Sequence, residues 1–77
     1  MFMRVLSSKG YAVYIYEDEH PPPHCHVIFN DETELSIEIP LLNEMYNKPV
    51  KRQVRKFLEE NLETLTEEWE KRNPKQH

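Results

Sequence analysis

The segment HPPPHCHV, from His20 to Val27, gathers three of the four histidines and three of the six prolines of this 77-residue chain. His24 and His26 are two residues apart, so on a β-strand both side chains point the same way, about 7 Å apart along the chain. Such a pair can supply two imidazole ligands to one divalent metal ion. His20, on the other side of the prolines, is the expected third ligand.

Three protein ligands leave one coordination position open, an arrangement that can activate water for hydrolysis. Glu34 or Glu38 can add a carboxylate if the strand register brings it alongside. Without a metal, the same histidines can act as acid and base, as phosphodiester cleavage requires, because imidazole titrates near neutral pH. A structural interpretation is that they hydrogen-bond backbone groups and hold the bend in the chain. The sequence leaves all three open.

A second candidate feature is the basic segment KPVKRQVRK, residues 48–56, which carries five positive charges and no acid. Its cations recur at three- and four-residue steps, so on a helix they share one face. Positive charges in the first turns oppose the helix dipole, which favours a nearby anion. Lys51, Arg52 and Arg55 are therefore candidates for binding a phosphate or an acidic partner, and a solvated helix face is the alternative.

The elements that position these residues follow from the periodicity of the sequence. Residues 11–17, 24–30 and 33–39 are rich in aromatic and β-branched residues and predict three strands of an antiparallel meander. Residues 1–6 add a short edge strand. Three consecutive prolines cannot lie inside a central strand, so they belong to the connection before the histidines.

The C-terminal part of the chain has a helical pattern. Apolar residues recur at three- and four-residue steps over residues 50–69. This apolar stripe drifts after Asn61, which fits one continuous helix with a shifting face or two helices broken at Asn61. Thr64 and Glu67 resemble a capping box and favour the break.

Together these elements predict an α+β fold, a small antiparallel sheet of three to four strands with the C-terminal helix packed on one face. The face that meets the helix is expected to carry Cys25, Val27, Phe29, Leu35, Ile37 and Ile39. His24 and His26 then lie on the opposite, polar face, exposed beside Glu34, Ser36 and Glu38. Cys25 alternates away from the histidines, which indicates a small buried residue rather than a nucleophile.

Length and composition restrict the class of protein. A chain of 77 residues, 38% hydrophobic and 31% charged, predicts a single soluble domain over residues 1–77. No apolar run approaches the ~20 residues of a membrane span, and MFMRVLSS lacks the pattern of a secretory signal. A single cysteine suits a reducing compartment, so we expect a cytoplasmic protein. The net charge of −4 argues against a nucleic-acid-coating surface, which leaves nucleic acid only as an enzyme substrate.

Two stretches, GYAVYIYEDEHPPPHCHV (residues 10–27) and FLEENLETLTEEW (residues 57–69), resemble the bacterial family called domain of unknown function 4160, whose hallmark is H-x-P-P-H-x-H-V. This chain departs from the hallmark by an extra proline and by Cys25, where the family often has an aromatic or aliphatic residue. The resemblance implies a small, stand-alone prokaryotic protein, often encoded beside another small protein in a suspected toxin–antitoxin-like pair. It supplies no established catalytic residue.

Two functions are compatible with these features. The first is an interaction protein, a component of a toxin–antitoxin-like two-gene module that binds a small cognate protein, with a homodimer as the other partner to consider. The segregated basic and acidic parts of the helical region suit electrostatic pairing. The alternative is a histidine-dependent nuclease or phosphodiesterase, with or without the assistance of a metal ion. It would use His20, His24 and His26, with the basic residues holding phosphate.

Overall fold

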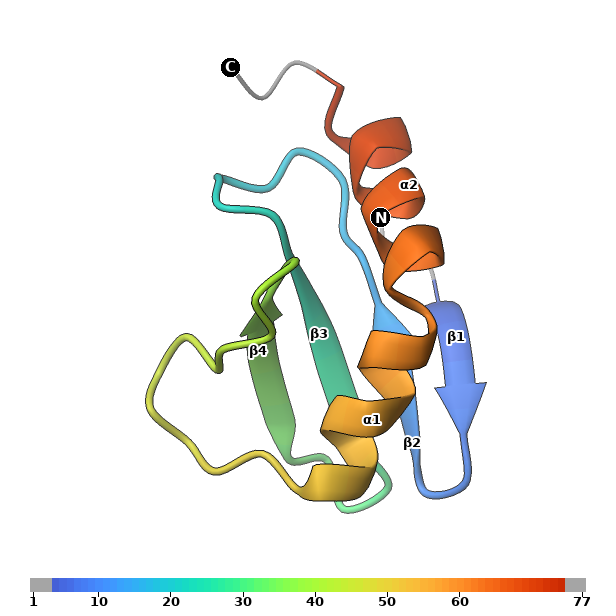
Figure 1. Cartoon of the computed structure of the whole chain (residues 1–77), viewed down its shortest axis with the longest axis vertical. Coiled ribbons are helices and arrows are strands. Elements are labelled where there is room, and N and C mark those ends of the chain that lie inside the picture. Colours follow the sequence, from blue (N-terminus) through green and yellow to red (C-terminus); the bar gives the residue numbers. More distant parts are fainter. Residues whose placement is uncertain (1–3, 75–77) are drawn as a thin grey trace.

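A four-stranded antiparallel meander with two helices forms the architecture of the chain (Figure 1). The computed structural model describes residues 4–74, so the first three residues of the predicted N-terminal strand lie outside the described residues. The elements are β1 (Arg4–Ser8), β2 (Tyr11–Tyr14), β3 (His24–Phe29), β4 (Glu34–Glu38), α1 (Arg52–Glu60) and α2 (Leu62–Arg72). The predicted α+β fold is therefore confirmed.

Short turns set the register of the sheet. Gly10, at a φ of +96°, completes the tight β1–β2 turn, where a left-handed conformation favours glycine. The β3–β4 turn is closed by the N–H of Phe29, which donates to the carbonyl of Thr33 at 2.9 Å. As a result His26 pairs with Tyr14 on one side and with Ser36 on the other.

The core lies between one face of the sheet and the helices, as the alternation of apolar residues predicted. Cys25, Val27 and Ile37 are fully buried there, and they pack with Val54, Leu58, Leu65 and Trp69 of the helices. Phe29 is only half-buried, at the end of β3. Burial of the thiol raises the pKa of Cys25 to about 12, which fits the predicted apolar role.

The helical region is broken at Asn61, which confirms the two-helix alternative. The Asn61 side chain donates to the carbonyl of Phe57 at 2.8 Å and so ends α1. The predicted capping role of Thr64 is wrong, because α2 already begins at Leu62 and includes Thr64. Each helix buries apolar side chains in the core, Val54 and Leu58 from α1 and Leu65 and Trp69 from α2.

Two connections depart from the predicted strands. β2 ends at Tyr14, so residues 15–17 belong to the loop that leads to the prolines. Residues 39–51 form a second loop, and Glu44 within it makes an isolated bridge to Ile37. This bridge places the loop along the outer edge of β4.

The carboxylate of Glu44 fixes that second loop. It accepts hydrogen bonds from the backbone N–H groups of Ser36, Tyr46 and Lys48 at 3.4, 2.7 and 2.6 Å. Partial burial is the largest single influence on the pKa of Glu44 and raises it, but the hydrogen bonds together outweigh it and lower that pKa. Among residues 4–74, no helix is long and apolar enough to cross a membrane.

Candidate metal centre

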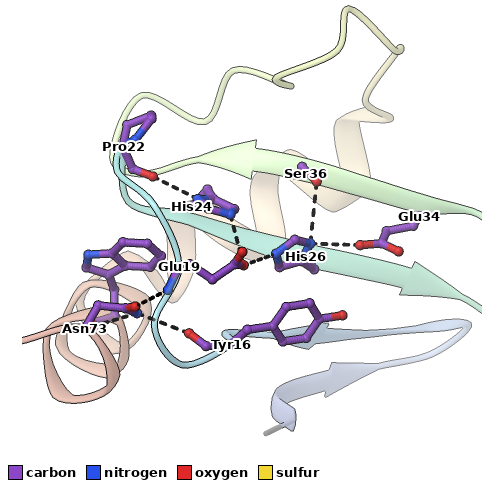
Figure 2. A network of polar contacts seen from close by, with 9 residues as sticks. Tyr16, Glu19, Pro22, His24, His26, Glu34, Ser36 and Asn73 are labelled. Carbon is purple, nitrogen blue, oxygen red and sulfur yellow. Dashed lines mark hydrogen bonds and ion pairs between the residues drawn. The ribbon is translucent and has the colours of Figure 1, made fainter. Parts of the chain in front are cut away.

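Two histidines and one glutamate converge at the start of β3 (Figure 2). Nε2 of His26 lies 2.5 Å from Oε1 of Glu19, and Nε2 of His24 lies 3.1 Å from the same oxygen. One potential ligand atom from each of the three residues lies within 4.8 Å of the other two. We call Glu19, His24 and His26 the histidine–glutamate cluster.

The other nitrogen of each ring contacts a hydrogen-bond acceptor. Nδ1 of His24 lies 2.8 Å from the carbonyl oxygen of Pro22. Nδ1 of His26 lies 2.8 Å from Oε2 of Glu34, and the hydroxyl of Ser36 is 3.5 Å from the same nitrogen. A carbonyl oxygen can only accept, so Nδ1 of His24 carries the hydrogen.

Both Nε2 atoms face one carboxylate oxygen, Oε1 of Glu19. The two rings also lie close to one another, with centroids 5.0 Å apart. Two arrangements fit this geometry. In one, hydrogens between Nε2 and Oε1 join the rings to Glu19; in the other, each ring donates from Nδ1 and turns a bare Nε2 towards a cation shared with Glu19.

The polar face of β3 is covered, which corrects the expectation that its histidines are exposed. His24 and His26 are only 6% and 8% exposed. The ring of Tyr16 stacks on His26 with centroids 4.1 Å apart, and Trp69 lies against His24 at 5.2 Å. Tyr16 of the loop of residues 15–23 and Trp69 of α2 therefore cover strand residues that the alternation alone places at the surface.

Tyr16 stacks on His26, and its hydroxyl also senses the negative charges of Glu34 and Glu19. Burial, and then the negative charges of Glu34 and Glu19, raise the pKa of the Tyr16 hydroxyl. The hydroxyl therefore stays protonated at neutral pH, and the ring presents an uncharged face to His26.

Glu19 replaces His20 as the third member of the cluster. His20 is exposed, and it is absent from the group of potential ligands found among residues 4–74. The acidic run EDE before His20 was the available signal for Glu19, but the sequence does not show which residue of a loop turns inwards. Glu34, which the sequence offered as a carboxylate ligand, contacts Nδ1 of His26 and not the converging Nε2 atoms. It is therefore a hydrogen-bond partner of His26 and not a member of the cluster.

The basic candidates lie away from this cluster. Arg52 and Arg55 belong to α1, and Lys51 precedes it, in the helical layer on the core side of the sheet. Lys51 lines a hollow with Phe29, Asp31 and Thr33, at the opposite end of β3 from His24. One strand length, roughly 16 Å, separates these two ends, so one phosphate cannot contact both groups directly.

A comparison with protein-family models finds a match over residues 10–70, to the family described as Domain of unknown function (DUF4160). The chain belongs to the DUF4160 family. The match covers more than half of the sequence and confirms the resemblance to this family. No curated protein and no solved structure matches the chain.

In this DUF4160 protein the whole histidine–glutamate cluster lies inside the matched segment, as does Glu34. Asn73, whose side chain contacts the loop of the cluster, lies beyond it. The family description states no function, so the chemistry has to be argued from these side chains.

Proposed function

We propose that this protein binds one divalent transition-metal ion, zinc first among them, through Glu19, His24 and His26, and uses it to activate water for hydrolysis. The observation that carries the proposal is the pair of contacts made by Nδ1 of His24 and Nδ1 of His26, the ring nitrogens that face away from the proposed ion. Histidines that bind metals typically donate their second N–H to a backbone carbonyl or a carboxylate. Here Pro22 supplies the carbonyl for His24, and Glu34 supplies the carboxylate for His26.

The donor set suits the proposed ion. Two imidazoles and a carboxylate are ligands that zinc accepts, with bonds of roughly 2.0–2.2 Å. Ligand atoms around such an ion stand about 3.3 Å apart, so the Glu19 oxygen has to move less than 1 Å from Nε2 of His26. The Glu19 side chain is 26% exposed, which leaves it room for this movement.

Three protein ligands leave a fourth position for water, as in catalytic rather than structural zinc sites. The ion lowers the pKa of the bound water, and the residues of this chain hold the ion and restrict solvent. A cavity of about 490 Å³ is lined by Trp69, which packs against His24, and by Asn73, which bonds the backbone of Glu19, together with Pro21 and Pro23. The three proposed ligands lie behind this lining and not in it. This cavity is the proposed approach for substrate.

The test is a zinc titration of the untagged, chelator-treated protein by isothermal calorimetry. We expect one ion per chain for the wild type and none for the His24→Ala/His26→Ala double variant. His20→Ala is the matched control and should bind like the wild type, because His20 is exposed and outside the cluster. Failure of the wild type to bind divalent zinc, iron or cobalt contradicts the proposal.

Hydrolysis is tested separately with the metal-loaded protein and a chromogenic phosphodiester, which addresses the predicted phosphodiesterase activity. We expect turnover that is lost with the double histidine variant and after chelation. Metal binding without turnover of phosphodiester, carboxylic ester or amide substrates would reject water activation and leave a structural metal site.

A second proposed function is binding of a small acidic cognate protein, as in a toxin–antitoxin-like two-gene module. Leu41 and Tyr46 favour it, since both are large apolar side chains about two-thirds exposed, at 66% and 67%. The same loop leads into the basic segment, and a hollow of about 480 Å³ is lined by Lys48 and Arg55 among others. Apolar anchors beside positive charge suit an acidic partner.

Co-expression with the product of the adjacent gene tests this second function. We expect the two proteins to co-purify, and we expect Leu41→Glu/Tyr46→Glu to abolish the complex. Arg4→Glu, a charge change on exposed β1 at the other side of the sheet, is the control. A complex that survives the loop variant, or no complex at all, counts against this surface.

A further inference from the structure

Asn73 joins the end of α2 to the loop that carries Glu19, although 54 residues separate the two in sequence (Figure 2). Its Oδ1 accepts a hydrogen bond from the backbone N–H of Glu19 at 2.7 Å. Its Nδ2 donates to the carbonyls of Tyr16 and Trp69 at 3.2 and 3.3 Å. Asn73 is 4% exposed, so these contacts are shielded from water.

Glu19 depends on such an anchor more than the two histidines do. His24 and His26 lie in β3, where ladder pairing fixes their backbone: His26 pairs with β2 and with β4, and His24 pairs with Glu38 of β4. Glu19 lies in the loop of residues 15–23, which has no regular secondary structure. A metal ligand on a loop is held in place only as well as the contacts to that loop allow.

We propose that Asn73 is a positioning residue of the metal site, which fixes the backbone of Glu19 and thereby sets the affinity for the ion. The inference rests on the proposed metal function. None of the hydrogen bonds found for Asn73 among residues 4–74 goes to a ligand atom of the cluster, so its effect passes through the loop backbone, chiefly through the N–H of Glu19. The two hydrogen bonds from Nδ2 orient the amide, so that Oδ1 and not Nδ2 faces this N–H.

The coupling is reciprocal, because any effect of α2 docking on metal affinity equals the effect of metal on docking. The backbone N–H of Asn73 donates to the carbonyl of Trp69 at 2.8 Å, in the last turn of the helix. Zinc binding is therefore expected to slow hydrogen exchange at Asn73 and at Glu19. Amides of the distant β1–β2 turn should exchange at the same rate with and without zinc.

The main test is a double-mutant cycle read by zinc affinity. Asn73→Leu keeps the size of the side chain and removes all three hydrogen bonds, so we expect affinity to fall about 10-fold. In a Glu19→Ala background the same change should have no further effect, because the residue through which Asn73 acts no longer contributes a ligand. A purely structural role would lower affinity equally in both backgrounds.

Asn61→Leu is the matched control, since the Asn61 side chain bonds only the carbonyl of Phe57 among the contacts found for residues 4–74. It should leave zinc affinity unchanged. If Asn73→Leu does not fold, Asn73→Ala removes the same three hydrogen bonds without placing a large apolar side chain there, and its zinc affinity should fall by the same factor of about 10.

The outcomes separate the two proposals. A wild type that binds no metal ends the proposed function and this inference with it. A wild type that binds zinc, with Asn73→Leu folded and binding equally well, overturns the role of Asn73 alone. Equal losses in the wild-type and Glu19→Ala backgrounds overturn it as well.

Discussion

The two faces of β3 are both buried, but different forces bury them. Cys25 and Val27 point into the core, where the helices cover them and non-directional apolar contact suffices. His24 and His26 point the other way, where the loop of residues 15–23 and Trp69 of α2 cover them and every polar ring atom meets a specific partner. Among residues 4–74, no buried polar side-chain atom lacks a hydrogen-bond partner.

The apolar face of β3 therefore mainly stabilises the fold, and its polar face mainly holds the proposed metal ligands in place. Apolar burial supplies most of the free energy of folding in a small domain, and it tolerates exchange of one apolar residue for another of similar volume. The polar face depends on geometry, because a buried charge or ring nitrogen is costly unless its partner lies at the right place. We therefore expect core variants to lose stability, and polar-face variants to lose mainly metal binding.

The largest effect on stability is expected on the apolar face. Leu58→Ala removes a fully buried side chain and leaves a cavity, which should lower the free energy of unfolding by about 2–5 kcal/mol. Urea denaturation measures it, with Leu41→Ala as the matched exposed control, expected within about 0.5 kcal/mol of the wild type. Equal effects of the two variants would mean that the helices do not cover this face.

On the polar face, His26→Gln should cost less stability and nearly all of the metal binding. Glu19 and Glu34 both lose their contact with the ring, but each is partly exposed and can be hydrated, so we expect about 1–3 kcal/mol in chelator. Zinc affinity should fall by more than 100-fold, beyond the range of outer-layer changes. A stability loss as large as that of Leu58→Ala with unchanged zinc affinity would assign His26 a structural role.

One step further out, Glu34→Gln should leave stability nearly unchanged and weaken zinc binding about 10- to 100-fold. The neutral amide still contacts Nδ1 of His26 but no longer balances the charge of a metal-bound imidazole. Glu32→Gln, at an exposed position in the adjacent turn, is the control. Unaltered affinity in Glu34→Gln would show that the outer contact to His26 is dispensable.

The smallest effect concerns the loop beside β4. The pKa of Glu44 is lowered in the folded state, so its contribution to stability is fully present above the unfolded pKa and is lost as pH falls through the folded value. We expect the stability difference between wild type and Glu44→Gln to be greatest near pH 6 and to shrink towards pH 3. Urea denaturation across this range measures it, and a constant difference would argue against hydrogen bonding to the charged form.

The apolar half of the molecule could be predicted from sequence because periodicity records it directly. Alternation in residues 24–30 placed Cys25 and Val27 in the core. The drift of the apolar stripe made a break at Asn61 one of two alternatives, and the structure has that break. Strand ends were less accurate, since residues 15–17 satisfy the same alternation as β2 but lie in the loop, where Tyr16 stacks on His26.

The polar half could be predicted only in part. The H-x-H spacing placed His24 and His26 together, but loop residues have no period, so Glu19 could not be distinguished from His20 as their companion. Asn73 was missed because its contact with Glu19 depends on where α2 ends in space, which no local pattern encodes. The distance of Lys51, Arg52 and Arg55 from the cluster likewise follows from the packing of α1.

The most direct test of a metal centre at the start of β3 is long-range ¹⁵N NMR of the histidine rings, recorded with and without one equivalent of zinc. We expect that with zinc both His24 and His26 adopt the Nδ1–H form, with Nε2 shifted by the bound ion, while His20 does not change. Spectra in which the His24 and His26 rings are the same with and without zinc would contradict a metal centre at this site.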